Sequence, residues 1–377
     1  MKTVLVSVSA LALGAAAAHA GGVERSTQSV GILFEKGTYV EFSLGSVSPH
    51  VSGTQATPIY APPPAPAGTI AVPAGSSTGN MTDSYVTYSL GFKTALSKNV
   101  DVALVLDEPI GADVTYPSGT GYAYAGSTGK ISSKAVTAML RYKLPSNVSL
   151  YGGIRGETAS GSVSIPLLSN YTMSTNDSTE FGYLVGVAYE KPEIALRVAL
   201  TYNSEIKHTF DVSENGGPSL PFSTTVPQSV NLEFQTGVAP KTLVFGSVRW
   251  REWKAFDITP VGYNMATGGS LVSYDNNTIT YTLGIGRKFN EHWSGAVQLG
   301  YEKSNGGFAG NLGPTDGYTS VGAGVTYTQD KVKVTMGVSY VMIGDAQTEN
   351  PSLPGTALSN FTNNHATAFG IKVGYNF

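Results

Sequence analysis

The last nine residues, FGIKVGYNF (369–377), alternate between apolar side chains and small or polar ones. Residues 331–340, KVKVTMGVSY, and residues 321–328, VGAGVTYT, repeat this pattern. Successive side chains of a β-strand point to opposite faces, so a period of two places all the apolar residues of such a segment on one face. These segments are therefore predicted to be strands of a sheet that separates an apolar environment from a polar one.

Eleven further segments show the same alternation, although the stretch around Leu243 shows it poorly. With the first three they predict fourteen strands, and an even number is typical of bacterial outer-membrane barrels. The eleven segments are residues 40–44, 86–92, 100–106, 136–142, 148–154, 181–189, 194–202, 230–238, 243–250, 281–289 and 293–301.

The connections between these segments alternate strictly between long and tight. The tight ones are residues 97–99, 145–147, 191–193, 239–241, 290–292 and 329–330. The long ones are residues 52–83, 112–129, 163–178, 209–228, 252–277, 303–315 and 342–364. Outer-membrane barrels have short periplasmic turns and long outer loops. The chain is therefore predicted to be all-β, with a 14-stranded antiparallel transmembrane β-barrel over residues 39–377 and both termini in the periplasm. A soluble β-sandwich is the alternative, but it would not sort its turns by length.

The composition excludes several classes of protein. The 377 residues include 45 glycines and no cysteine, only 13% are charged, and the formal net charge is -3. The absence of cysteine rules out a disulfide scaffold and a thiolate metal site. A nucleic-acid partner is not expected, because binding phosphates requires a basic surface.

Residues 1–20, MKTVLVSVSALALGAAAAHA, read as a signal peptide. Lys2 provides the positive start, an apolar stretch follows, and Ala18-His19-Ala20 is a small-residue cleavage pattern. A transmembrane anchor is the alternative, but the apolar stretch is short for one. The mature chain is then expected in the outer membrane of a Gram-negative cell, in contact with its lipid and lipopolysaccharide.

Residues 21–38 precede the first predicted strand and are too long for a simple lead-in. Ile32, Leu33 and Phe34 form an apolar cluster within them that requires burial. A 14-stranded barrel is too wide for wall side chains alone to fill it. We therefore expect this segment to be a short plug inside the barrel. A disordered periplasmic tail is the alternative.

Nine charged residues lie on the face opposite the apolar one. Arg or Lys facing lipid at the bilayer midplane would cost about 2–4 kcal/mol, so the nine are predicted to line the lumen. Both signs occur, and mutual pairing is the expected role for most of them. Arg155 and Arg197 are candidates to bind a substrate carboxylate. The nine are Glu41, Lys93, Asp101, Arg141, Arg155, Glu157, Arg197, Glu233 and Lys372.

The third predicted strand contains Pro109, followed by Gly111. Proline has no N–H to give to a ladder and belongs at sheet edges or bulges. A kink is therefore expected around Asp107, Glu108, Pro109 and Gly111, with a gap in the wall that faces the bilayer. The alternative is that Pro109 only marks the end of the strand.

The chain resembles the FadL-type family of outer-membrane transporters for long-chain fatty acids and hydrocarbons. The resemblance rests on the fourteen strands, the segment ahead of them, EPIGAD (108–113) with Tyr116-Pro117, VPQSVNL (226–232), and Trp250 with Trp253. It implies a hatch in the lumen, a lateral opening at the third strand and hydrophobic binding sites near the outer loops. The plug here is shorter than the family's hatch and lacks its Asn-Pro-Ala motif.

Two long loops carry apolar patches that suit a capture site for hydrophobic solutes. Ile59 and Tyr60 precede a proline-rich run in the first loop, and Leu220 and Phe222 flank a proline in another. Proline-rich segments are stiffened in advance. Ordinary solvated loops are the alternative.

The predicted function is passive outer-membrane transport of hydrophobic compounds, with long-chain fatty acids as the first candidate. An aqueous diffusion porin is the alternative, and a structural or adhesive barrel is a third. No metal or other cofactor is expected, and the histidines lack the spacing of metal ligands. No enzyme is expected, because the Gly-x-Ser-x-Gly match at residues 75–79 lies in a loop with no helix after it. A monomer is expected, since closure removes every sheet edge.

Overall fold

A computed structural model of the chain describes residues 23–61 and 64–377, so the predicted signal peptide lies outside the described residues. The fold is a closed barrel of fourteen antiparallel strands, and each of the fourteen predicted segments coincides with one of them to within two residues at its ends or lies inside it. The first seven barrel strands are β1 (Tyr39–His50), β5 (Tyr85–Ala95), β6 (Val100–Asp107) continued by β7 (Gly111–Thr115), β8 (Thr128–Lys143), β9 (Val148–Ile165), β11 (Ser178–Lys191) and β12 (Leu196–Asn203). The other seven are β15 (Ser229–Ala239), β16 (Thr242–Arg251), β19 (Thr278–Lys288), β20 (Trp293–Glu302), β22 (Tyr318–Gln329), β23 (Val332–Ile343) and β26 (His365–Asn376).

Short elements occupy the long connections and the N-terminal segment. The strands are β2 (Gly53–Gln55), β3 (Ile59–Tyr60), β4 (Ile70–Val72), β10 (Tyr171–Thr175), β13 (Ile206–Glu214), β14 (Gly217–Val226), β17 (Asp257–Ile258), β18 (Val272–Ser273), β21 (Phe308–Ala309), β24 (Ala346–Glu349) and β25 (Ala357–Phe361). The helices are the 3-10 turns η1 (Gly31–Phe34), η2 (Pro192–Ile194) and η3 (Trp253–Ala255), and α1 (Val261–Thr267).

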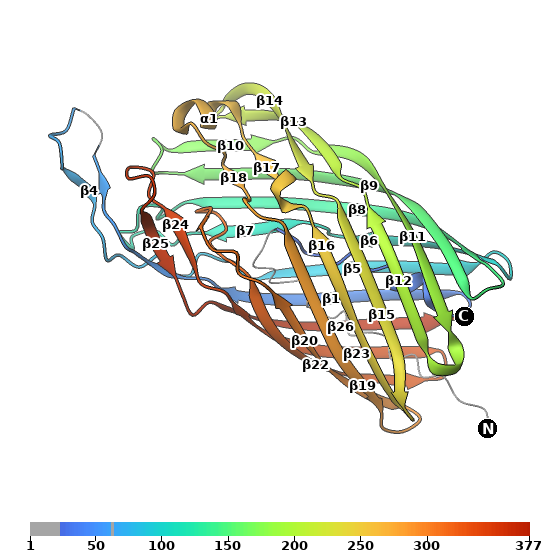
Figure 1. Cartoon of the computed structure of the whole chain (residues 1–377). Coiled ribbons are helices and arrows are strands. Elements are labelled where there is room, and N and C mark those ends of the chain that lie inside the picture. The colour runs from blue at the N-terminus through green and yellow to red at the C-terminus, as the bar shows by residue number, and fades with distance from the viewer. Residues whose placement is uncertain (1–22, 62–63) are drawn as a thin grey trace.

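The barrel closes where β1 pairs with β26 along its whole length, from Tyr39 opposite Asn376 to His50 opposite His365. The tight turns and the C-terminus lie at one end, and the long connections gather at the other (Figure 1). Asn147, Lys241 and Asp330 take up positive φ in three of the tight turns, a conformation in which Asn and Asp cost least. The alternation of long and tight connections thus places each class at its own end.

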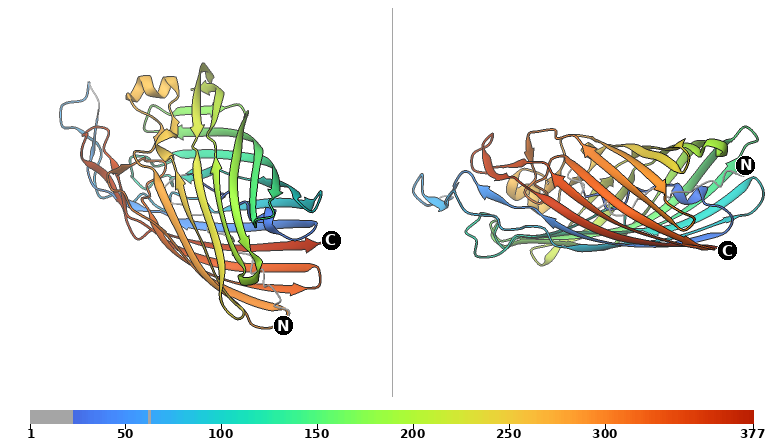
Figure 2. Two further views of the ribbon diagram at one scale, coloured as in Figure 1. Left: turned by 45° about the vertical axis from the view of Figure 1, so that its right-hand side comes forward. Right: turned by 90° about the horizontal axis from the view of Figure 1, so that it is seen from below.

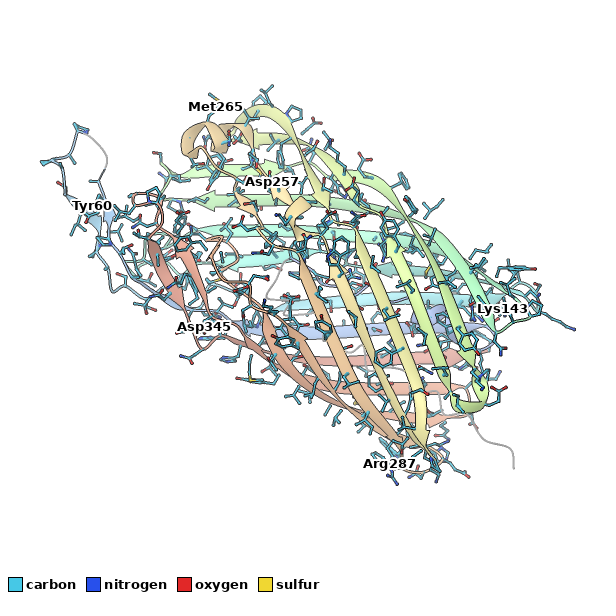
Figure 3. The ribbon with its side chains drawn as sticks, viewed as in Figure 1. Tyr60, Lys143, Asp257, Met265, Arg287 and Asp345 are labelled. Carbon is cyan, nitrogen blue, oxygen red and sulfur yellow. The ribbon has the colours of Figure 1, made fainter. Side chains whose placement is uncertain are left out.

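The two faces of the wall have opposite character. Side chains such as Phe181, Leu283 and Leu299 project outward and are more than half exposed, as a lipid-facing surface requires. On the inner face Lys93 Nζ lies 3.1 Å from Asp101 Oδ1, and Lys372 Nζ lies 3.4 Å from Glu41 Oε2. The side chains labelled in Figure 3 mark the two ends, with Lys143 and Arg287 at the tight turns and Tyr60, Met265 and Asp345 among the long connections.

The poor alternation around Leu243 has a packing cause. Leu243 and Phe245 face the lumen and are buried. The Phe245 ring covers Gly284 on the neighbouring strand, where an added Cβ would lie 2.4 Å from the ring. Apolar residues thus occupy both faces of β16, and the period of two is blurred in the sequence.

Several long connections contain more strand than the sequence indicates. β8 and β9 run for 16 and 18 residues, and β13 and β14 form a hairpin over residues 206–226. A separate sheet joins β2, β25, β24 and β21, and the β3–β4 hairpin projects away from the barrel (Figure 1). Leu358 and Phe361 are fully buried among these connections. The long loops therefore pack into a folded cap.

No helix within the described ranges combines the length and the apolar character needed to cross a membrane.

The orientation of the two faces gives a direct stability test. Leu283→Arg would place a guanidinium against lipid in the middle of β19, and we expect a loss of about 2–4 kcal/mol in folding free energy. Gln298→Arg, which faces the lumen from the next strand, is the matched control and should cost much less. Denaturant titration in phospholipid vesicles measures both, and equal losses would contradict the assignment of the faces.

Candidate functional site

The N-terminal segment lies inside the barrel, and η1 sits near the end that carries the C-terminus (Figure 2). Ile32 and Leu33 are buried there. The Phe34 ring lies between two guanidinium groups, with the Arg141 Cζ 4.3 Å and the Arg197 Cζ 4.7 Å from the ring centre. Such cation–π contacts are strengthened when the groups are desolvated. The three apolar residues thus anchor the segment in the lumen.

A buried ionic cluster holds the upper part of the segment. The Glu24 carboxylate pairs with both Arg249 and Arg251 of β16, and all three side chains are buried. Arg249 Nη1 also donates to the carbonyl oxygen of Thr27 at 3.0 Å. Removing one partner of a buried pair leaves an uncompensated charge. Glu24 therefore ties the segment to the wall through two buried ion pairs.

The third strand is interrupted at the position of Pro109. Asp107 pairs with Ala135 of β8 and Gly111 pairs with Ser132, so residues 108–110 face only two residues of their neighbour. The Ser133 hydroxyl accepts from the Ile110 amide at 2.9 Å and donates to the Ile110 carbonyl at 2.7 Å. The kink is therefore held to β8 by the two hydrogen bonds of the Ser133 side chain.

On its other side the kink separates from β5. The ladder between them stops at Leu90 opposite Leu106 and resumes only where the Asp83 amide meets the Asp113 carbonyl. Within the described chain, no backbone hydrogen bond joins residues 86–89 to the third strand. The Glu108 carboxylate instead accepts from the backbone amide of Tyr88. We call this interruption between β5 and the third strand the first window.

The N-terminal segment takes the place of β5 as the partner of the kink. The Arg25 amide donates to the Pro109 carbonyl at 2.9 Å, and the Gly111 amide donates to the Val23 carbonyl at 2.8 Å. The Arg25 side chain pairs with Asp113 and lies over the Tyr85 ring at 4.1 Å. The segment and the kinked strand therefore form one hydrogen-bonded unit.

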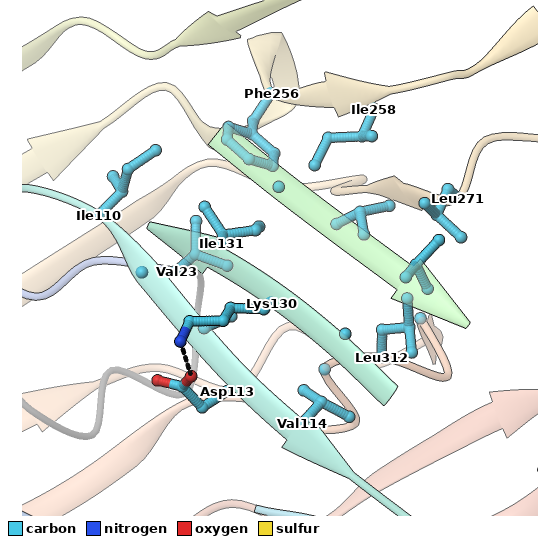
Figure 4. A pocket seen from close by; sticks show the side chains of 18 of the residues that line it. Val23, Ile110, Asp113, Val114, Lys130, Ile131, Phe256, Ile258, Leu271 and Leu312 are labelled. Carbon is cyan, nitrogen blue, oxygen red and sulfur yellow. Dashed lines mark ion pairs between the residues drawn. The ribbon is translucent and has the colours of Figure 1, made fainter. Parts of the chain in front are cut away.

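Above this unit lies an apolar cavity of about 210 Å³. Figure 4 shows apolar side chains converging on it from the kink, from β8 and from the loop cap. They include Ile110, Ile131, Phe256, Leu271 and Leu312. An apolar cavity with a few polar groups is the usual form of a site for small hydrophobic ligands.

The cations that line this cavity already have carboxylate partners. Lys130 Nζ lies 3.8 Å from Asp113 Oδ1, the pair marked in Figure 4. Arg25 pairs with the same carboxylate. Glu24, also in the lining, is held by two arginines. The lining therefore suits an uncharged ligand better than an anion.

A second, polar chamber of about 420 Å³ lies around the N-terminal segment. Arg155 and Arg197 line this chamber rather than the apolar cavity. Arg155 Nε donates to the Thr137 hydroxyl at 3.0 Å, and Arg197 lies against Phe34. The structure thus brings the two candidate arginines into one chamber but separates them from the apolar lining.

The four predicted capture residues lie in different surroundings. Phe222 lines the apolar cavity, where its ring packs at a tilt against Phe210. Ile59 is buried in the core of the loop cap, whereas Tyr60 and Leu220 are exposed, Leu220 at 66%. Of the four, Phe222 alone is in the lining of the apolar cavity.

Sequence reasoning did not identify Glu24, Arg249 or Arg251. Arg249 and Arg251 occupy alternate positions of β16 on its polar face, which is a signal for the lumen. Their partner lies more than 200 residues away in the chain. Within residues 23–61 and 64–377, no three histidine or carboxylate side chains gather as a metal site would need.

A barrel with a luminal segment and an interrupted wall defines an outer-membrane transport protein. The family model described as "Outer membrane protein transport protein (OMPP1/FadL/TodX)" matches residues 75–377. Because this match covers most of the chain, the protein belongs to that family. The members of this family are transport proteins rather than enzymes.

Solved structures share the fold at low sequence identity. A FadL homologue from Pseudomonas aeruginosa is 16% identical over 92% of both chains, with a TM-score of 0.69. The toluene transporter TodX of Pseudomonas putida is 11% identical over 97% of this chain and 96% of its own, with a TM-score of 0.62. The toluene transporter TbuX of Ralstonia pickettii is 11% identical over 92% and 90%, with a TM-score of 0.59. No curated protein sequence matches the chain.

Breaking the Glu24 tie should loosen the luminal segment. Glu24→Gln leaves Arg249 and Arg251 uncompensated, which costs about 3–5 kcal/mol for a buried pair. We expect a raised ion current in planar bilayers, because the segment then leaves the lumen more often. Lys36→Gln, at an exposed site of the same segment, is the control and should leave the current unchanged. An unaltered current in Glu24→Gln would argue against the tie.

The loop cap should respond to acid through Glu214. Burial opposes ionisation of this carboxyl, but donors on Ser219 and Tyr171 and the amides of Gly262 and Tyr263 together hold its pKa below the ordinary value of 4.5. A carboxyl with a lowered folded pKa stabilises the fold above its unfolded pKa, and this contribution is lost as the pH falls through the lowered value. Proteolysis of residues 261–267 should therefore be slow at neutral pH and faster in acid. Glu214→Gln should be cleaved faster already at neutral pH, and a cleavage rate that is the same at both pH values in the unsubstituted protein would contradict this role.

Proposed function

We propose that this protein carries hydrophobic compounds passively across the outer membrane and releases them sideways through the first window. Cargo enters the apolar cavity from the loop cap, passes the kink and leaves between β5 and the third strand into the bilayer. The observation that carries the proposal is the position of the apolar cavity. Tyr85 and Gly111, one from each side of the first window, both line it.

The physical need for such a route follows from the cargo. Apolar molecules are poorly soluble in water, so a water-filled pore gives them no favourable path. The polar chamber below the cavity is occupied in part by the luminal segment, to which Arg141 donates at the Leu33 carbonyl oxygen. A lateral route avoids this chamber. With the tight turns in the periplasm, the loop cap faces the lipopolysaccharide, where hydrophobic solutes arrive.

Uncharged compounds, such as aromatic or alkane hydrocarbons, are the favoured cargo. The support is that Arg25 and Lys130, the cations of the apolar lining, are paired with Asp113. Long-chain fatty acids are the second candidate, because Arg155 and Arg197 line the adjacent chamber and offer charge to a carboxylate. The closed barrel is proposed to act as a monomer, since the pairing of β1 with β26 removes the free sheet edges.

Closing the first window should stop transport. We would replace residues 107–112 by alternating Val and Thr, which restores strand-forming residues and removes Pro109. Uptake of radiolabelled toluene by cells should fall toward that of cells without the protein. The same pattern placed at residues 102–106, where both ladders are complete, is the matched control. Toluene uptake that persists unchanged in the first variant would overturn the lateral route for this cargo.

A parallel measurement with radiolabelled palmitate separates the two cargo classes. Saturable palmitate uptake that is lost in Arg155→Ala or Arg197→Ala, with toluene uptake retained, would favour fatty acids. Toluene uptake without palmitate uptake would favour uncharged cargo. A steady ion current together with uptake of small hydrophilic solutes would instead indicate an aqueous porin.

A further inference from the structure

A second interruption of the wall lies between the sixth and seventh barrel strands. Here β10 and β11 form one strand with a break at residues 176–177, and β12 and β13 form the next with a break at residues 204–205. The ladder runs from Lys191 opposite Leu196 up to Leu184 opposite Asn203. It resumes only at Thr175 opposite Val212.

The same register holds on both sides of this gap, but within it β11 and β13 form no ladder. The Ser204 amide donates to the Tyr183 carbonyl at 2.9 Å, and the Asn176 amide donates to the Asp211 carbonyl at 3.1 Å. In the part of the chain that the structure describes, no backbone hydrogen bond joins residues 178–182 to residues 206–210. We call this interruption the second window.

The breaks at residues 176–177 and 204–205 do not lie opposite each other, and this explains why the strands cannot form a ladder across the second window. Continuing the register would place Phe181 opposite Ile206. Phe181 points outward and is 72% exposed, whereas Ile206 is buried on the inner side. Residues directly opposite each other in an antiparallel pair must point to the same face. Pairing would therefore require one strand to turn its side chains over.

The second window borders the same apolar cavity as the first. Thr175 from one side of the window and His208 and Phe210 from the other line the cavity. The two windows also stand at matching positions in the sheet, since Asp107 pairs with Ala135, Ala135 with Glu157 and Glu157 with Glu180. The apolar cavity thus borders both windows, which are separated by the third strand, β8, β9 and β11.

The inner rim of the second window carries buried polar atoms. Glu157 is 0% exposed and His208 is 1% exposed, and His208 Nε2 lies 3.8 Å from Glu157 Oε1. Neither carboxylate oxygen and neither ring nitrogen has a hydrogen-bond partner within the described residues. Buried polar atoms are satisfied in most proteins by protein groups or by ordered water, so this pair has hydrogen-bonding capacity left for a water molecule or a hydroxyl group. The hydroxyl group of an alcohol can donate a hydrogen bond to the Glu157 carboxylate and accept one from the His208 imidazole. A carboxylate anion would be repelled by Glu157.

We propose that the second window is a separate lateral outlet, used by hydrophobic molecules that carry one uncharged hydroxyl group. This inference rests on the proposed transport function and extends it to a second route and a second class of cargo. The hydroxyl group passes the Glu157–His208 pair while the apolar part passes between Phe181 and Ile206 into the bilayer.

The test uses the absence of cysteine from the chain. A pair of substitutions, Phe181→Cys with Lys207→Cys, places two outward-facing thiols across the second window for a short bis-maleimide linker. The matched control, Val187→Cys with Leu200→Cys, links directly opposed residues of the same two strands where the ladder is complete. Each pair is built in the protein with the first window intact. Heat-modifiable mobility in gels confirms that each barrel has folded.

The probe is radiolabelled 1-dodecanol. With the first window intact, linking the second window should lower dodecanol uptake and leave toluene uptake unchanged, while the control pair changes neither. If linking the second window has no effect on dodecanol uptake, or lowers toluene uptake equally, the second outlet is refuted. If the unsubstituted protein takes up neither dodecanol nor toluene, the proposed function itself fails, which is a different result.

Hydrogen exchange tests the window without transport. Amide direction alternates along a strand, so the Tyr183 amide, which reaches Ser204, shows that the amides of Thr179 and Phe181 face the second window. They should exchange faster in detergent micelles than the amides of Val185 and Val187. Equal protection at all four positions would show a closed ladder and overturn the proposal.

Discussion

Every peptide group in a bilayer must find its hydrogen-bond partner within the protein, because lipid offers none. Along the complete ladders the barrel meets this constraint by closing β1 on β26, and the alternating strands place apolar side chains toward lipid and charged ones inside. The interruption at Pro109 is stable only because other groups replace the missing ladder. The N-terminal segment provides backbone partners and Glu108 binds the Tyr88 amide.

Because the N-terminal segment pairs with the kinked strand in place of β5, the plug and the first window form one structural unit. The segment that fills the lumen is also the one that pairs with the kinked strand, and Glu24 fixes it to β16 on the far side. The segment therefore lines the polar chamber and at the same time pairs with the interrupted strand of the wall. The apolar cavity above it stays separate from the chamber below. The apolar cavity thus borders the wall interruptions directly, whereas the luminal segment stands between it and the lower chamber.

The period of two and the sorting of connection lengths were sufficient to predict the fourteen strands, because both reflect local geometry. Pro109 indicated the interruption for the same reason, since its effect on a ladder is local. The ionic tie could not be predicted, because Glu24 and Arg249 are distant in sequence and meet only in the folded barrel. The loop cap was also missed, since the burial of Ile59 depends on packing among separate loops. The second window depends on two breaks whose offset only the register reveals.

The most direct test of the account is the position of a bound cargo. Crystals soaked with 4-bromotoluene would locate the bromine by its anomalous scattering. We expect a peak in the apolar cavity, near Ile110, Phe256 and Leu312, with the luminal segment still in place. A peak in the polar chamber beside Arg155 and Arg197, with the segment displaced, would show that cargo passes straight through the barrel and would contradict lateral release.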